Sequence, residues 1–195
     1  MYKNCYKLIS LDELIDILDP QGKKTGKNCL KTVAHQQGFY HATVHIWFYT
    51  LEGNILLQQR GARKTIYPLL WDVSVAGHVN SGENLFDAAV REVKEEIGLT
   101  ISKDDLRKIG VMKSFKSYDS GVIDNEFHTV FISKLNEDIK NLCPQKEEVE
   151  ALKIVSSSTF KELLEDSKHN SHFIASNKTY YDFVLNEIKN YCVQT

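Results

Sequence analysis

The sequence predicts one α/β domain, in which a mixed β-sheet lies between helices and a further helix ends the chain. Short segments of alternating or β-branched residues recur along the chain, with turn-forming residues between them. One central segment instead has the apolar spacing of an amphipathic helix. The length of 195 residues suits a single domain with terminal additions, covering residues 1–195.

The first part of the chain is expected to form strands joined by short turns, at residues 13–18, 41–48, 55–60 and 71–76. Asp19 to Gly22 has the composition of a turn, and Lys23 to Lys27 resembles a charged, flexible return. Glu52 to Asn54 turns the second strand into the third, and Gly61 to Leu70 is an expected loop. The fourth strand runs directly into Gly77.

The clearest helix follows that glycine. Its apolar stripe consists of Phe86, Ala89, Val90, Val93 and Ile97. Asn84 is the expected N-cap, with Asp87 three residues later as a variant of the capping box, and Gly98 is the expected C-terminal stop. Beyond it, strands are expected at 108–115, 127–133 and 150–155, a short helix at 159–166, and a terminal helix at about 178–191.

Composition limits the classes of partner. Lys and Arg number 24 against 26 Asp and Glu, which gives a formal charge of -2. This balance argues against a nucleic-acid polymer or a membrane as partner, although a small anionic metabolite needs only a local basic cluster. No apolar run approaches a membrane span or a signal peptide. Widely spaced cysteines suggest free thiols and a cytoplasmic protein: Cys5, Cys29, Cys143 and Cys192.

The central helix carries like charges that helix stability does not explain. Glu92, Glu95 and Glu96 lie away from the apolar stripe, at a spacing that costs roughly 0.2–0.5 kcal/mol per pair in an isolated helix. They also lie in the second half of the helix, where its dipole disfavours anions. One interpretation is a solvated face balanced by Arg91 and Lys94. The other is that the carboxylates converge on Mg²⁺ or Mn²⁺, hard cations that prefer oxygen ligands.

The surrounding residues favour the cation. From Gly77 to Leu99 the chain reads GHVNSGENLFDAAVREVKEEIGL, which resembles the signature of the Nudix hydrolase family at every specified position. Glu83 follows Gly77 after five residues, and Arg91 follows after seven more. The expected strand, loop and helix are also the context that the motif requires. The resemblance extends from about Ile15 to Leu164 and implies a Nudix-type mixed sheet between helices, with the terminal helix outside it.

Read with this resemblance, the motif suggests a metal site and a catalytic group. Glu92 and Glu96, one helical turn apart, are the expected ligands of Mg²⁺ or Mn²⁺, and Gly77 lets its carbonyl approach the cation. Glu95 is either a third ligand or the base that activates water. Glu95, Glu96 and Glu126 are the expected catalytic residues.

Other residues are expected to support the motif or bind substrate. Glu83 and Arg91 are expected to pair and brace the loop against the helix, although each could be an ordinary surface charge. Arg60 and Lys64 match positions that hold the diphosphate in the isopentenyl-diphosphate isomerase branch of the family, and a guanidinium suits bidentate phosphate recognition. His78 is expected at the substrate, or alternatively bonded to a loop carbonyl.

The resemblance to that isomerase branch and its hydrolase relatives rests on further residues. Trp71 to His78 matches a tryptophan-to-Gly-His pattern, and Asp124-Asn125-Glu126 resembles an acidic triplet. The branch's metal site then has its comparable positions at His41, His78, Asp124 and Glu126. His35 lies one residue out of register. The remaining histidines are expected to be structural or at the surface: His45, His128, His169 and His172.

Three functions stay open: a hydrolase of a nucleoside-diphosphate-type or other X-linked diphosphate, a prenyl-diphosphate isomerase, and a non-catalytic binding module. Ala76 disfavours the isomerase, because it stands where that enzyme has an acid/base cysteine and a methyl group cannot transfer a proton. The complete motif favours the hydrolase over a binding module. The X group and the oligomeric state are not fixed by the sequence, and a homodimer is one option. Aromatic residues that could stack on a base serve equally well as core: Trp47, Tyr67, Phe115 and Tyr118.

Overall fold

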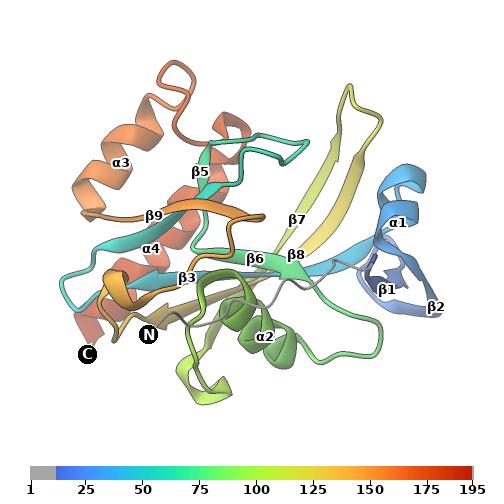
Figure 1. Ribbon diagram of the computed structural model, residues 1–195, viewed down its shortest axis with the longest axis horizontal. Coiled ribbons are helices and arrows are strands. Elements are labelled where there is room, and N and C mark those ends of the chain that lie inside the picture. Colours follow the sequence, from blue (N-terminus) through green and yellow to red (C-terminus); the bar gives the residue numbers. More distant parts are fainter. Residues whose placement is uncertain (1–11, 195) are drawn as a thin grey trace.

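A mixed β-sheet forms the centre of the protein, which the computed structural model describes over residues 12–194 (Figure 1). The expectations for Cys5 and the first residues therefore lie outside the described range. The main path of the sheet is β5 (Trp71–Asp72), β4 (Ile55–Arg60), β3 (His41–Tyr49), β8 (Ile123–Lys134) and β7 (Arg107–Ser117). Two further strands join it, β6 (Val75–His78) beside β3 and β9 (Val149–Val155) beside β4. Among the named strands of residues 12–194, β3 and β8 are the one parallel pair.

The sheet forks along β3, and this fork positions the candidate site. At its C-terminal end β3 pairs with β4 through Tyr49 and Ile55. Closer to its start β3 pairs with β6, where Val44 lies opposite Gly77 and Thr43 opposite His78. On the other side of β3, the parallel register places His41 opposite Glu126 of β8. Residues far apart in the chain therefore meet at the first half of β3.

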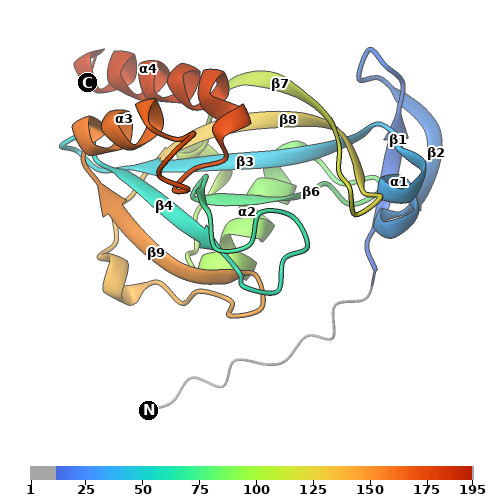
Figure 2. The same cartoon turned by 90° about the horizontal axis from the view of Figure 1, so that it is seen from above.

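Helices cover the two faces of the sheet, as the α/β expectation requires. On one face α2 (Leu85–Ile97) packs against β3, β6 and β8 in a core that contains Val44, Val93 and Phe131. On the other face α3 (Ser157–Glu165) and α4 (Lys178–Gln194) pack over a core that contains Trp47 and Tyr181. Figure 2 shows α3 and α4 together along one side of the sheet.

The ends of α2 follow from its sequence. The side chain of Asn84 accepts a hydrogen bond from the backbone of Phe86, and Gly98 ends the helix in the left-handed conformation at φ 71°. Asp87 makes an ion pair with Lys103 rather than a bond to the N-cap, so the capping-box expectation finds no such contact. The remaining short helical segments are 3-10 turns at Lys103–Asp105, Ile139–Asn141 and Ala175–Asn177.

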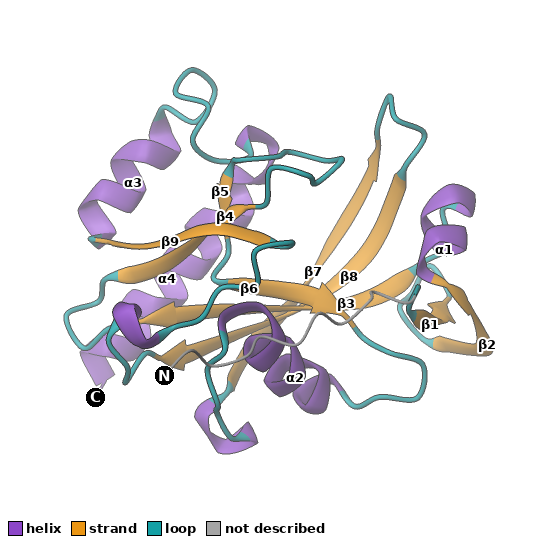
Figure 3. Cartoon of the chain, viewed as in Figure 1, coloured by secondary structure: helices purple, strands orange, loops and turns teal. Residues whose placement is uncertain are grey.

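Two local expectations were wrong, and one helix was not predicted. Lys23 to Lys27 is not a flexible return, because β1 (Leu14–Leu18) pairs with β2 (Lys24–Leu30) in a separate two-stranded sheet. Trp71 to Ala76 is not one strand but β5 and the start of β6. The helix α1 (Lys31–Gln37) was not expected at all. Figure 3 shows α1 beside the β1–β2 hairpin, at the end of the molecule remote from α3. Among residues 12–194, no helix has the length and apolarity needed to span a membrane.

Candidate active site

Two carboxylates of α2 are buried against the β6 backbone, whereas a third points outward. Glu92 and Glu96 are 7% and 5% exposed, and the side chain of Glu95 is 45% exposed. Gly77 makes this arrangement possible: a Cβ atom there would lie 2.0 Å from the carboxyl carbon of Glu92. The glycine therefore leaves the space that the Glu92 carboxylate fills. The backbone N–H of Ala76 donates to Glu96 at 3.3 Å.

Burial makes these carboxylates poor anions unless a cation is near. Burial raises the pKa of Glu92 to about 7 and that of Glu96 to about 8. The charge of Glu92 adds to the upward shift at Glu96, whereas nearby Lys64 opposes it. Gln58, oriented so that its amide nitrogen faces these oxygens, donates to Glu96 at 3.1 Å and to the Ser74 carbonyl at 2.7 Å. Two adjacent buried carboxylates are the oxygen donors that Mg²⁺ or Mn²⁺ prefers, so they fit such a cation.

Arg91 holds this part of the site together. Its guanidinium donates twice to Glu83, at 2.9 Å in each case, which links the β6–α2 loop to the helix. It also donates to Glu92 at 2.7 Å, to Glu95 at 3.0 Å and to the His78 carbonyl at 2.8 Å. The Glu83–Arg91 contact expected from the sequence is therefore present, and Arg91 additionally orients Glu92. The positive charge that opposes the burial of Glu96 comes instead from Lys64.

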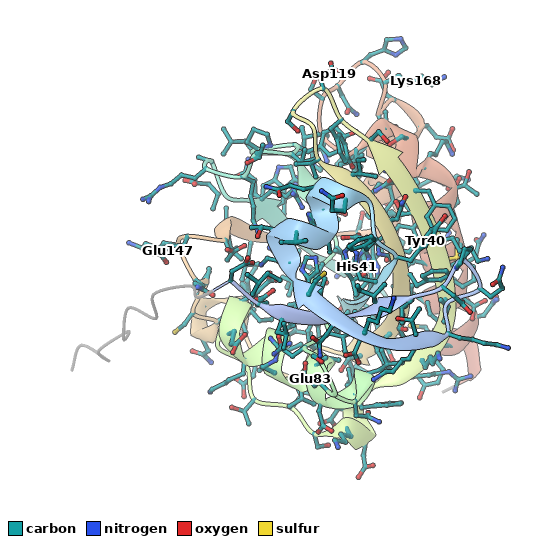
Figure 4. All side chains as sticks on the ribbon, turned by 90° about the vertical axis from the view of Figure 1, so that its right-hand side faces the viewer. Tyr40, His41, Glu83, Asp119, Glu147 and Lys168 are labelled. Atoms are coloured by element: carbon teal, nitrogen blue, oxygen red, sulfur yellow. The ribbon has the colours of Figure 1, made fainter. Side chains whose placement is uncertain are left out.

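A second cluster, the histidine–acid group, lies on the other side of the Gly-His step. It consists of His35 of α1, His41 of β3, His78 of β6 and Glu126 of β8, with one ligand atom of each within 4.8 Å of the others. The nitrogen Nε2 of His41 lies 3.4 Å from Glu126, and Nε2 of His78 lies 3.7 Å from it. The Nε2 atoms of His35 and His78 are 3.1 Å apart. Figure 4 shows His41 behind α1 and the β1–β2 hairpin.

The electrostatics of the histidine–acid group also fit a cation. Burial would raise the pKa of Glu126, but a hydrogen bond from His41 and the nearby imidazoles hold it well below its usual range. Burial lowers the pKa of His35 and His78, which favours their neutral, metal-binding forms. Nδ1 of His41 donates to the Phe39 carbonyl at 2.8 Å, which directs Nε2 into the group. That Nε2 is buried and faces Glu126 at 3.4 Å, and no described residue gives it a closer, well-aligned hydrogen bond.

Comparison with known proteins assigns the chain to a family. The model of the NUDIX domain matches residues 39–176, which contain the carboxylates of α2, Arg91 and most of the histidine–acid group. The chain belongs to the Nudix family. It is 35% identical over 157 residues to Nudix hydrolase 3 of Arabidopsis thaliana, a match that covers 78% of this chain but only 20% of the plant protein. It is 30% identical over 142 residues to an isopentenyl-diphosphate Delta-isomerase of Cutibacterium acnes, covering 71% of each chain.

The fold agrees with this assignment. A crystal structure of a Deinococcus radiodurans protein superposes with a TM-score of 0.68, at 17% sequence identity, and the match covers 87% of this chain and 98% of that one. The Nudix fold is therefore confirmed, and relatives from both the hydrolases and the isomerases agree with the branch expected from the sequence.

In this Nudix domain, the two basic residues expected at the diphosphate already have protein partners. The guanidinium of Arg60 donates to the carbonyls of Ile66 at 2.9 Å and Tyr67 at 3.1 Å, so it braces the loop between β4 and β5. Lys64 pairs with Glu148, the residue just before β9, and its charge interacts with that of Glu96. Binding of diphosphate by Arg60 and Lys64 stays a prediction, and for Arg60 it requires exchange of these carbonyl contacts.

The aromatic residues divide between core and surface. Trp47 is fully buried and donates to the Tyr180 hydroxyl at 2.8 Å, which makes it unsuitable for stacking on a base. Tyr67 and Tyr118 meet edge to face with ring centroids 5.8 Å apart, which joins the β4–β5 loop to the β7–β8 hairpin. Phe115 is 49% exposed and packs on Tyr40.

Sequence reasoning missed or understated three parts of the site. His35 was one residue out of register in the family comparison, but α1 carries it into the histidine–acid group. Asp124, expected in that group, instead has its Oδ1 atom 3.5 Å from His35 Nδ1, at the edge of the cluster. Gln58 was not predicted at the site, although it follows three apolar residues of β4 and a buried amide indicates a polar partner. His128 is buried and stacks on the half-buried His45, and its Nδ1 lies 3.5 Å from Glu126, so a purely structural role for these two histidines stays a prediction.

Proposed function

We propose that the chain hydrolyses a diphosphate linkage in a small molecule, with Mg²⁺ or Mn²⁺ held by Glu92 and Glu96. The observation that carries this proposal is the pair of buried carboxylates, packed against the glycine of a complete family motif, with burial raising both pKa values. Relatives that bear the name Nudix hydrolase support a pyrophosphohydrolase. A divalent cation would neutralise charge on the diphosphate and make water a stronger nucleophile at neutral pH.

The other residues of the motif would position the cation ligands and transfer the proton of the attacking water. Arg91 orients Glu92 and ties the helix to the β6–α2 loop through Glu83. Of the three glutamates Glu92, Glu95 and Glu96, Glu95 is the most exposed. Once released from Arg91 it would take a proton from the attacking water or add a third carboxylate to the cation. Phosphoryl transfer needs mainly such positioning and charge stabilisation.

The histidine–acid group supports a second cation close to the first. Three imidazoles and Glu126 suit a transition metal better than Mg²⁺, which prefers all-oxygen ligands. Ala76 N–H bonds Glu96, Gly77 accommodates Glu92, and His78 belongs to the histidine–acid group. Three consecutive residues of β6 therefore connect both clusters.

The isomerase alternative is favoured by the histidine–acid group and by the isomerase relatives. It is disfavoured by Ala76, whose side chain packs against the apolar core and offers no acid. A screen of nucleotide sugars, dinucleotides, nucleoside di- and triphosphates and coenzyme derivatives tests the proposal. Products are followed by phosphorus NMR with Mg²⁺, with Mn²⁺ and with a chelator. Cation-dependent cleavage of a phosphorus–oxygen–phosphorus bond is expected, and turnover that persists unchanged in chelator would contradict the proposal.

A further inference from the structure

A pocket separate from the buried carboxylates lies on the part of the sheet that α2 leaves uncovered. Its volume is about 470 Å³, within the range of roughly 300–1,000 Å³ common for small-molecule sites. Strands β3 and β8 form its floor, β7 forms one wall, and the β1–β2 hairpin with the β6–α2 loop forms the other. Of the residues assigned to the candidate active site, only Glu83 lines it. Figure 4 looks onto this side of the molecule, with Glu83 below the β1–β2 hairpin.

The pocket has a mostly apolar surface of fixed shape. The apolar lining includes Leu18, Ala42, Val79, Leu85, Val111 and Phe127. The hairpin turn packs closely on the floor: Gly22 has φ +83°, and a Cβ atom there would lie 3.1 Å from the Phe127 ring. On the opposite wall Val111 is 48% exposed. An apolar concavity of this kind favours a ligand with an apolar body over water.

The charges around the pocket leave a positive rim. Both acids have partners: Asp16 accepts from Lys24 at 2.7 Å and Ser81 at 2.6 Å, and Glu83 is held by Arg91. The two lysines of β7 at the pocket, Lys108 and Lys113, differ from these acids. Within residues 12–194 neither ammonium has a carboxylate partner, and Nζ of Lys113 lies 5.4 Å from the centre of the Phe127 ring.

We propose that this pocket binds a small organic anion with an apolar body, of which a medium-chain carboxylate is the simplest example. The anionic group lies between Lys108 and Lys113, and the apolar body lies against Phe127 and Val111. The limited volume favours a small molecule over a protein segment, and the two unpaired lysines select an anion over a neutral or cationic amphiphile.

The probe is 1-anilinonaphthalene-8-sulfonate, an aromatic anion whose fluorescence rises in an apolar site. Saturable binding to the folded protein is expected, with displacement by decanoate but not by decyltrimethylammonium, which has the same chain and the opposite charge. Calorimetric titration with decanoate alone gives an independent measurement. Neither measurement needs diphosphate hydrolysis, so the result stands apart from the proposed enzymatic function.

Variants locate the binding. Lys108→Glu and Lys113→Glu are each expected to weaken binding of decanoate by about fivefold or more, the scale of one exposed charge contact. Val111→Trp is expected to fill the pocket and abolish binding. Lys134→Glu and Ile154→Trp are matched controls on exposed strand positions outside the pocket, and they are expected to bind as the wild type does. The thermal stability of each variant is measured first, so that a loss of binding is not caused by unfolding. The proposal is overturned by the absence of saturable binding, by equal displacement with the cationic amphiphile, or by wild-type affinity in both lysine variants and Val111→Trp.

Discussion

In the presence of a chelator, Glu96→Gln is expected to be more stable than the wild type above about pH 8. Burial raises the pKa of Glu96 from 4.5 to about 8. Between these two values the folded state holds a proton that the unfolded chain has lost, so the free energy of unfolding falls as the pH rises. The amide of the variant carries no charge to bury, and its oxygen can still accept from Ala76. The pH-dependent loss should therefore be smaller in the variant.

The size of the effect follows from the shift. Each pKa unit corresponds to about 1.4 kcal/mol, so the full shift amounts to roughly 5 kcal/mol. Relaxation of the ionised site reduces this, and a gain of about 2–4 kcal/mol is expected at pH 8.5. In a domain of this size the gain raises Tm by about 5–15 °C. The assay is thermal and urea denaturation in chelator at a series of pH values from about 5 to 9.

The neighbouring acid supplies the control. The side chain of Glu95 is 45% exposed and its pair with Arg91 is open to solvent, so Glu95→Gln should change the stability by less than about 1 kcal/mol at every pH. The reasoning is refuted if the wild-type stability is flat over this pH range in chelator, or if Glu95→Gln and Glu96→Gln behave alike.

Three further outcomes are expected. Millimolar Mg²⁺ or Mn²⁺ should stabilise the wild type in a melting experiment, by about 2.7 kcal/mol at a hundred times Kd, and should do so less in Glu92→Gln; equal shifts would argue against Glu92 as a ligand. Gly77→Ala should destabilise the fold by about 1–3 kcal/mol and abolish the cation effect, because its Cβ would lie 2.0 Å from the Glu92 carboxyl carbon. Gly110→Ala is the control, because its Cβ would lie 3.4 Å from the Phe183 ring, and it should have neither effect. The wild type should not interconvert isopentenyl and dimethylallyl diphosphate, because Ala76 offers no acid; proton exchange at the allylic carbons, measured with isotope label, would make isomerase the leading function. Trace isomerase activity in Ala76→Cys would show that the histidine–acid group remains arranged for it.

The periodic elements of the fold could be predicted from sequence because their signals are local. The stripe on α2 and the Asn84 and Gly98 ends depend on neighbouring residues, and α2 forms where expected. The β-branched and aromatic run of β3 is likewise decisive because β3 is buried on both faces. By contrast, β2 is almost entirely exposed and lacks an alternating apolar pattern, and it forms a strand by pairing with β1. Such tertiary stabilisation leaves no pattern in a single segment.

In the candidate site, too, the features with local sequence signals were predicted and those that depend on tertiary contacts were not. The motif spacing identified Glu92 and Glu96, because i to i+4 positions share one helix face. It did not reveal that Gly77 makes room for the Glu92 carboxylate, since that contact joins a strand to a helix. Nor could it assign His35 to the histidine–acid group or commit Arg60 to loop carbonyls, because both depend on the path of irregular segments.

The turnover of Glu96→Gln on the best diphosphate substrate tests the central claim most directly. With saturating Mg²⁺ or Mn²⁺, kcat is expected to fall by at least about a hundredfold relative to wild type, because one carboxylate of the cation site is lost while the shape is kept. The variant should still fold, as its denaturation curve verifies. A folded Glu96→Gln protein with wild-type kcat and unchanged cation dependence would contradict the assignment of the buried α2 carboxylates as the metal site.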